Sequence, residues 1–212
     1  MTRIGSARPE HAGFIASTIL SAQRGPKPRG WFDIALDRPE AQCLEFVTRI
    51  SVARAISWWH TSQFLIAEVD VRPAAALCAL PSAGTGSAAW RAIGEVAAET
   101  GLTASAVEAI RRRGAYSRSC WVQGGDEDWL IEHVAADRSY RGRGLVQTLI
   151  EHALAKGKSA GFHRASISFL IGNEAAERCY AKAGFVFAEE KRDPQFEALT
   201  GAPGFRRFER AI

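Results

Sequence analysis

Residues 141 to 146 read Arg-Gly-Arg-Gly-Leu-Val, and they lie where an apolar strand pattern gives way to a helical one. Gly142 and Gly144 lack side chains, so the backbone there can bend sharply and approach a ligand closely. A helix that starts at this turn directs its free N–H groups and the positive end of its dipole toward it. Arg141 and Arg143 add positive charge. The segment therefore predicts an anion site, for which a diphosphate is the natural ligand.

The periodicity along the rest of the chain predicts strands that alternate with helices. Short apolar or alternating runs predict strands at 64–70, 74–80, 129–137, 165–171, 184–188 and 205–212. Helical spacing predicts helices at 9–24, 38–58, 87–100, 103–113, 144–157 and 174–183. This order is typical of an α/β protein, and 212 residues suit a single domain over 1–212.

Composition argues against several classes of protein. The net charge of +4 fits an anionic cofactor, but the charge is spread along the chain, which argues against a nucleic-acid-binding module. The four cysteines lie far apart, without histidines at metal-ligand spacing, so we expect no metal site. Reduced thiols suit the cytoplasm. No signal-type core and no membrane-length apolar run occurs, so no membrane partner is expected.

A second motif follows the glycine turn after about thirty residues, at 173–185. Asn173, Ala176 and Tyr180 are separated by three and then four residues, so they share one face of a helix. Taken together, the two motifs resemble those of the GNAT superfamily of acyl-CoA-dependent N-acetyltransferases. Its second segment reads Asn-x-x-Ala-x-x-x-Tyr-x-x-x-Gly-Phe, which this chain matches at every fixed position. Its loop pattern, Gln/Arg-x-x-Gly-x-Gly/Ala, is matched at the first four positions but ends here on Val146 instead of a small residue.

The resemblance implies a fold and a cofactor site. The fold would be a mixed, largely antiparallel sheet of six to seven strands flanked by helices, with the CoA-binding core at 129–190. Acetyl-CoA would be the co-substrate, and its pyrophosphate would lie on the backbone N–H groups of Arg141, Gly142, Arg143, Gly144, Leu145 and Val146. Its pantetheine arm would pair with the exposed backbone of Val134, Ala135 and Ala136. Asn173 and Ala176 would lie near this arm, and Tyr180 beside the sulfur as general acid.

The chemistry also needs a base. An amine with a pKa near ~10.4 must lose a proton before it attacks a thioester. Many members of the superfamily use a glutamate on the strand before the turn, so we favour Glu132, with His133 or a water molecule as alternatives. Strand alternation would place Glu132 on the face of Leu130, Val134 and Ala136, and His133 on the other. Only one of the two would then face the substrate.

The implied activity is transfer of an acetyl group from acetyl-CoA to a primary amine of a small molecule or peptide by direct attack. A non-catalytic acyl-CoA-binding regulatory domain and a basic nucleic-acid-binding module are the alternatives. The segment 82–128 is longer than the connection usual in the superfamily, and its helices would cover the acceptor site or form a homodimer surface. Trp58 and Trp59 are read as core aromatics rather than acceptor contacts. Variable loops build acceptor pockets, so the acceptor and the acyl length stay open.

Overall fold

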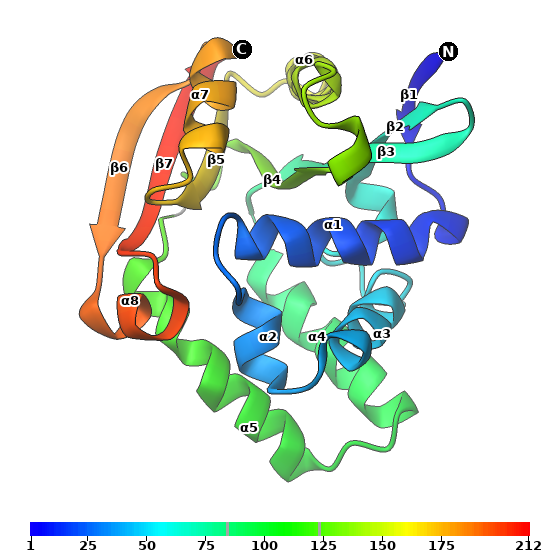
Figure 1. Cartoon of the computed structure of the whole chain (residues 1–212), viewed down its shortest axis with the longest axis vertical. Coiled ribbons are helices and arrows are strands. Elements are labelled where there is room, and N and C mark those ends of the chain that lie inside the picture. Colours follow the sequence, from blue (N-terminus) through cyan, green and yellow to red (C-terminus); the bar gives the residue numbers. More distant parts are fainter. Residues whose placement is uncertain (84, 123) are drawn as a thin grey trace.

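The computed structural model describes residues 1–83, 85–122 and 124–212. Its centre is a seven-stranded sheet with the order β1-β2-β3-β4-β5-β7-β6 (Figure 1). Strands β1 to β7 span Thr2–Ser6, Phe64–Val69, Arg72–Pro81, Trp129–Ala136, Arg164–Leu170, Val186–Arg192 and Gly204–Ala211. Adjacent strands are antiparallel except β4 and β5, which are parallel. The expected mixed, largely antiparallel sheet is thus confirmed.

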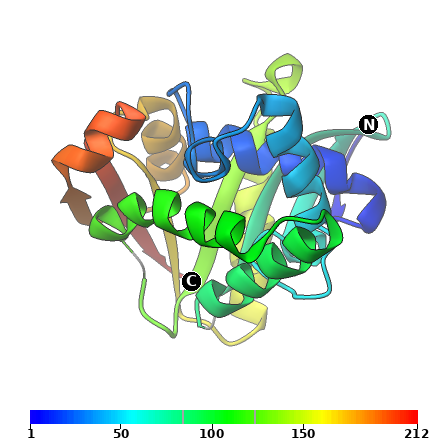
Figure 2. The ribbon, with the colours of Figure 1, turned by 90° about the horizontal axis from the view of Figure 1, so that it is seen from below.

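Helices cover both faces of this sheet. Helices α1 to α8 span Ala12–Arg24, Trp31–Leu36, Glu40–Ile50, Thr85–Glu99, Ala104–Gly114, Leu145–Ser159, Glu174–Lys182 and Pro194–Thr200. Figure 1 shows α1 to α5 on one side and α6 on the other, and Figure 2, seen from below, shows α4 and α5 in front of the sheet. The helices α4 and α5 form in the segment 82–128, as expected. Within the described residues, no helix is both long and apolar enough to cross a bilayer.

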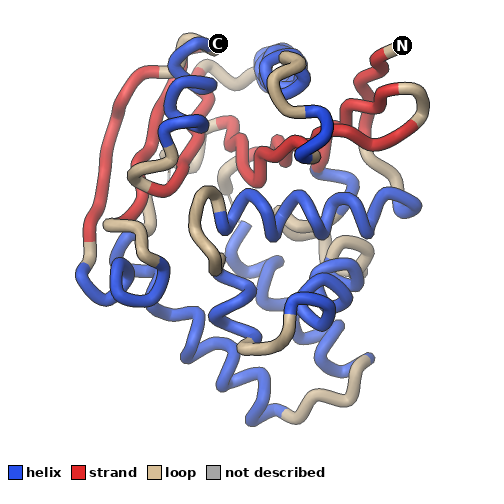
Figure 3. The backbone as a smooth tube through the Cα atoms, viewed as in Figure 1, coloured by secondary structure: helices blue, strands red, loops and turns tan. Residues whose placement is uncertain are grey.

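Besides short 3-10 helices, one strand and two helices were missed by the sequence patterns, and one helix was predicted too long (Figure 3). The short strand β1 and the six- and seven-residue helices α2 and α8 carry too few apolar repeats to stand out. The helix predicted at 38–58 ends at Ile50. The Ser51 hydroxyl donates to the carbonyl of Val47, and the Ser51 carbonyl accepts from Thr61 N–H, so the chain turns away.

Alternation along the central strands divides the main core into two clusters. The α1-side core includes Phe64, Ile66, Ala76, Cys78, Leu80 and Leu130. The α6-side core includes Leu65, Ala67, Ala75, Leu77, Ala79 and Ile131, with Leu149 and Ile150 of α6. Because both faces of β3 are buried, its sequence is almost uniformly apolar from Ala74 to Leu80. A ligand can therefore reach the middle of this sheet only where strands separate.

Such a separation occurs between β4 and β5. Their parallel pairing ends at Ile131 and Ile167, although β4 continues to Ala136 and β5 to Leu170. Beyond that point β4 stays paired to β3, and β5 stays paired to β7. The gap opens toward the carboxyl ends of both strands, where the glycine turn follows β4.

Candidate active site

The glycine turn has the conformation that its sequence predicts. Gly142 and Gly144 have φ angles of 75° and 76°, a left-handed region that side-chain-bearing residues rarely adopt. A Cβ on either residue would meet no atom within 4 Å, so the backbone angle rather than crowding requires glycine. Gly144 is the N-cap of α6 and supplies no capping side chain. The first N–H groups of α6 are therefore open to an anion.

The side chains of the turn leave these N–H groups accessible. Arg141 turns back, with its Nε donating to the carbonyl of Ala136 at 3.4 Å. The Arg143 guanidinium lies 5.0 Å from the centre of the Tyr140 ring. Val146, which stands where a small residue is usual, packs its half-buried side chain against the α6-side core. The side chain of Val146, the one position that departs from the family's loop pattern, therefore lies partly in the core.

Strand β4 contains a bulge at His133. The register with β3 shifts between Ala76 and Cys78, so His133 and Val134 together stand opposite one residue of β3. His133 has a φ of 52°, unusual for a residue with a side chain. The bulge lies just beyond the last β4–β5 pair and thus inside the opening between the strands.

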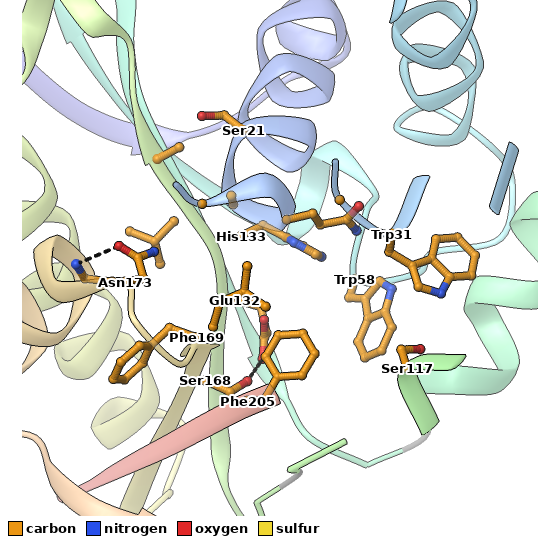
Figure 4. A pocket seen from close by; sticks show the side chains of 18 of the residues that line it. Ser21, Trp31, Trp58, Ser117, Glu132, His133, Ser168, Phe169, Asn173 and Phe205 are labelled. Carbon is orange, nitrogen blue, oxygen red and sulfur yellow. Dashed lines mark hydrogen bonds between the residues drawn. The ribbon is translucent and has the colours of Figure 1, made fainter. Parts of the chain in front are cut away.

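Because of the bulge, the prediction that Glu132 and His133 lie on opposite faces of the strand is wrong. Glu132 and His133 both line one cavity, where Figure 4 shows their side chains together. Val134 and Ala136 pack against the α6-side core, away from the face of Leu130. The extra residue at the bulge shifts the inward and outward pattern by one position. Both candidate bases are therefore at the site.

The Glu132 carboxyl is suited to accept a proton near neutral pH. Burial raises its pKa to about 7, and hydrogen bonds to the carboxylate oppose part of this increase. One of them comes from the Ser168 hydroxyl on β5, 2.7 Å from Glu132 Oε1 (Figure 4). Ser168 had no distinctive signal in the sequence, because β5 also contains Arg164 and Ser166.

The imidazole of His133 is held neutral instead. Its ring stacks on Phe64 at a centroid distance of 6.4 Å and meets Trp58 edge-on at 6.3 Å. Burial lowers the pKa of His133 to about 3, so the ring does not keep a proton at neutral pH. Its Nε2 is buried and has no hydrogen-bond partner among the described residues. These properties favour Glu132 over His133 as the base.

Helix α7 brings the second motif to the same cavity. Asn173 is its N-cap, with Oδ1 accepting from Ala176 N–H at 3.3 Å. Tyr180 is buried and packs edge-on against Phe169 of β5 at 5.5 Å. Burial raises the pKa of its phenol far above the usual range, so Tyr180 stays protonated. Asn173, Ala176 and Tyr180 all line the cavity together with Glu132.

The cavity has a volume of about 1070 Å³ and extends from the glycine turn to helices α4 and α5. Trp58 and Trp59 line the cavity, although neither was expected to do so; Trp59 also belongs to the α1-side core, and Trp58 packs against that core. Trp31 of α2 and Trp90 of α4 line it as well, and the sequence patterns did not point to them. Within the described residues no cluster of potential metal ligands was found.

Comparison with known proteins shows which family has this arrangement. A sequence profile described as "Acetyltransferase (GNAT) family" matches residues 29–185, about three quarters of the chain. The chain belongs to the GNAT family. The resemblance drawn from the two motifs is thereby confirmed. Because the family is one of acetyltransferases, an acyltransferase activity is the general expectation for its members. A search of curated proteins found no significant match.

Solved structures resemble this GNAT protein over nearly their whole length. One crystal structure of an acetyltransferase has a TM-score of 0.69 at 16% identity, with 99% of each chain covered. An N-acetyltransferase from Staphylococcus aureus Mu50 has a TM-score of 0.66 at 20% identity, covering 98% of this chain and 100% of its own. A polyamine N-acetyltransferase from Drosophila melanogaster, which forms N-acetylagmatine, has a TM-score of 0.55 at 15% identity, with 100% of both chains covered. At such identities the likeness is one of fold.

Proposed function

We propose that this GNAT protein is an N-acetyltransferase that moves an acetyl group from acetyl-CoA to the primary amine of an acceptor by direct attack. One observation carries the proposal. The Glu132 carboxyl, with a pKa of about 7, lies in the same cavity as the glycine turn and Tyr180. An amine acceptor needs a proton acceptor, and the departing thiolate benefits from a proton donor.

Acetyl-CoA would lie along this cavity. The open N–H groups from Arg141 to Val146 would hold the pyrophosphate, and Arg141 and Arg143 add positive charge. The edge of β4 that no longer pairs with β5, from Val134 to Ala136, would pair with the pantetheine arm. Asn173 and Ala176 line the cavity beside that edge. When bound, acetyl-CoA supplies the acetyl group as a reactive thioester.

The residues of this chain would then handle two protons. The carboxylate of Glu132 takes a proton from the ammonium form of the acceptor, directly or through water, and frees the nitrogen lone pair for the thioester carbonyl. A C–N bond forms and the C–S bond breaks. The Tyr180 hydroxyl donates its proton to the departing sulfur, and the phenolate regains a proton, directly or through water, from the nitrogen of the tetrahedral intermediate, which becomes the neutral amide. A backbone N–H beside the β4 bulge stabilises the oxyanion.

The segment 82–128 would shape the acceptor pocket. Residues of both α4 and α5 line the cavity, including Thr85, Trp90 and Arg111. Helix α4 also places Ile93 and Val96 in the α1-side core, so the segment is part of the domain 1–212. A homodimer surface on the same helices stays a prediction. The cytoplasm is the proposed location, in keeping with four free cysteines.

A panel of primary amines tests the proposal, with release of the CoA thiol as the measurement. Acetyl-CoA turnover that depends on an amine would support an N-acetyltransferase. CoA binding without turnover on any amine would support the rival, a non-catalytic acyl-CoA-binding domain. Binding to DNA or RNA that weakens steeply with salt would support a nucleic-acid-binding module.

The substitution Gly144→Ala should raise the Kd for CoA about tenfold. A left-handed conformation costs an alanine about 1–2 kcal/mol, and relaxing it would misalign the N–H groups of the turn. Calorimetric titration with CoA measures the effect. Gly13→Ala is the matched control, because Gly13 is exposed on α1 and has ordinary helical geometry. A Kd within twofold of the unmodified protein would contradict the proposed pyrophosphate site.

The substitution Ser168→Ala should move the acidic limb of the pH profile from about 7 toward about 8. The hydroxyl stabilises the Glu132 carboxylate, so its loss raises the pKa by about one unit. The profile of kcat/KM against pH measures this shift. Ser166→Ala is the matched control on the same strand, because Ser166 Oγ has no hydrogen-bond partner among the described residues. Identical profiles for both variants would exclude Ser168 as a positioning residue.

A further inference from the structure

Tryptophans gather at the acceptor end of the cavity. Of the six in the chain, five line it: Trp31, Trp58, Trp59, Trp90 and Trp121. Trp31 stacks on Trp59 at 5.9 Å, and Trp58 lies 5.8 Å from Trp59 and 5.4 Å from Trp121. These five residues, here called the tryptophan wall, come from α2, α4 and two loops far apart in the sequence. The wall offers both stacked and edge-on aromatic contacts.

The tryptophan wall begins beside the proposed base. Trp58 contacts the ring of His133, the residue that follows Glu132. Figure 4 shows Trp58 and Trp31 across the cavity from Glu132, with Phe205 beside the carboxylate. An acceptor whose nitrogen reaches Glu132 would therefore place its body against aromatic rings.

The charges around the acceptor end disfavour a second cation on the acceptor. Among the described residues that line the cavity, Glu132 is the only carboxylate. Three arginines also line the cavity: Arg118, Arg29, which pairs with Asp37 at 3.7 Å, and Arg111, which pairs with Glu108 at 3.7 Å. The Arg111 guanidinium lies 4.4 Å from the centre of the Trp90 ring, so the cation position over that ring is already filled. The far end of a polyamine would meet these arginines and no carboxylate, other than Glu132, among the described residues that line the cavity.

We propose, resting on the acetyltransferase activity proposed above, that the acceptor is a monoamine with a flat aromatic body, an arylalkylamine. Its ring packs on the tryptophan wall, and its single amino group is delivered to Glu132. Burial of the ring favours binding, and aromatic pairs prefer the stacked and edge-on geometries that the wall offers. Polyamines such as agmatine and spermidine are poor acceptors.

Acetylation of tryptamine, hexylamine, agmatine and spermidine at equal concentrations tests the inference. We expect kcat/KM for tryptamine to exceed that for agmatine or spermidine at least tenfold, and to exceed that for hexylamine as well. Trp58→Leu should raise the KM for tryptamine about tenfold with an unchanged Kd for CoA, and Trp58→Phe should restore most of the affinity. A polyamine used as well as tryptamine would overturn the inference.

Charge reversal tests the electrostatic part separately. Arg118 is exposed and has no ion-pair partner among the described residues, so the fold should tolerate its replacement. Arg118→Glu should increase the ratio of kcat/KM for agmatine to that for tryptamine severalfold, whereas Arg118→Gln should increase this ratio less. An unchanged ratio would overturn the role assigned to the arginines.

Measurements of amine binding test this inference separately from the proposed acetyltransferase activity. If no amine supports thiol release, the N-acetyltransferase proposal fails, and calorimetry with CoA-saturated protein then decides the ligand class. Binding of tryptamine but not of agmatine would support the aromatic preference even without turnover. Binding of agmatine alone, or of neither amine, would overturn it.

Discussion

Replacing Glu132 by glutamine should lower kcat/KM about 10²- to 10⁴-fold, the range that general-base catalysis contributes. The amide keeps the size of the carboxylate and can still meet the Ser168 hydroxyl, but it cannot take a proton from the amine. Steady-state thiol release over a range of amine concentrations, from well below to above KM, measures the loss. The affinity for CoA should stay unchanged, because Glu132 lies outside the glycine turn.

The pH profile gives the same prediction a second readout. A base must be deprotonated to work, and the pKa of Glu132 is raised to about 7, so activity should fall as the pH drops below about 7. The residual activity of Glu132→Gln should no longer fall as the pH drops below about 7. If His133 were the base, its pKa of about 3 would place the limb far lower. A glutamine variant that keeps both near-normal activity and the limb near 7 would exclude Glu132 as the base.

Replacing Tyr180 by phenylalanine should lower kcat about 10²-fold or more, at the lower end of the general-acid range. Burial raises the pKa of the phenol, so the hydroxyl is protonated across the working range and is available to the departing thiolate. The KM for the acceptor and the Kd for CoA should change little. Single-turnover measurement of thiol release reports the chemical step directly.

The phenylalanine ring isolates the hydroxyl in this test. Tyr180 packs edge-on against Phe169, a contact that the variant keeps. The melting temperature should therefore stay close to that of the unmodified protein, so that lost activity does not reflect lost structure. An unchanged kcat would mean that water, not Tyr180, protonates the sulfur.

Much of the fold was predictable because its signals are local. The apolar runs of β2 to β5 and the periodic helices α1 and α4 to α7 follow from the spacing of buried residues in the sequence. The elements that were missed, β1, α2 and α8, are short and gain their order from tertiary packing. The end of α3 at Ile50 depends on hydrogen bonds of Ser51, one of them to the distant Thr61.

The proposed cofactor side of the site was predictable in the same way. Gly142 and Gly144 were expected at a turn before a helix, and both have the left-handed backbone angles that glycine permits. The spacing of Asn173, Ala176 and Tyr180 was sufficient to expect them on one element that lines the site. Both motifs are short segments whose chemistry depends on neighbours in the chain.

The proposed acceptor side was decided by contacts between distant segments. The bulge at His133 depends on the register with β3, and a shift of one residue there brought both Glu132 and His133 into the cavity. Ser168 meets Glu132 only because β5 lies beside β4. The tryptophan wall likewise joins residues from 31 to 121. Spacing along a chain specifies a turn or a helix face, whereas pKa values and pocket walls depend on which segments pack together.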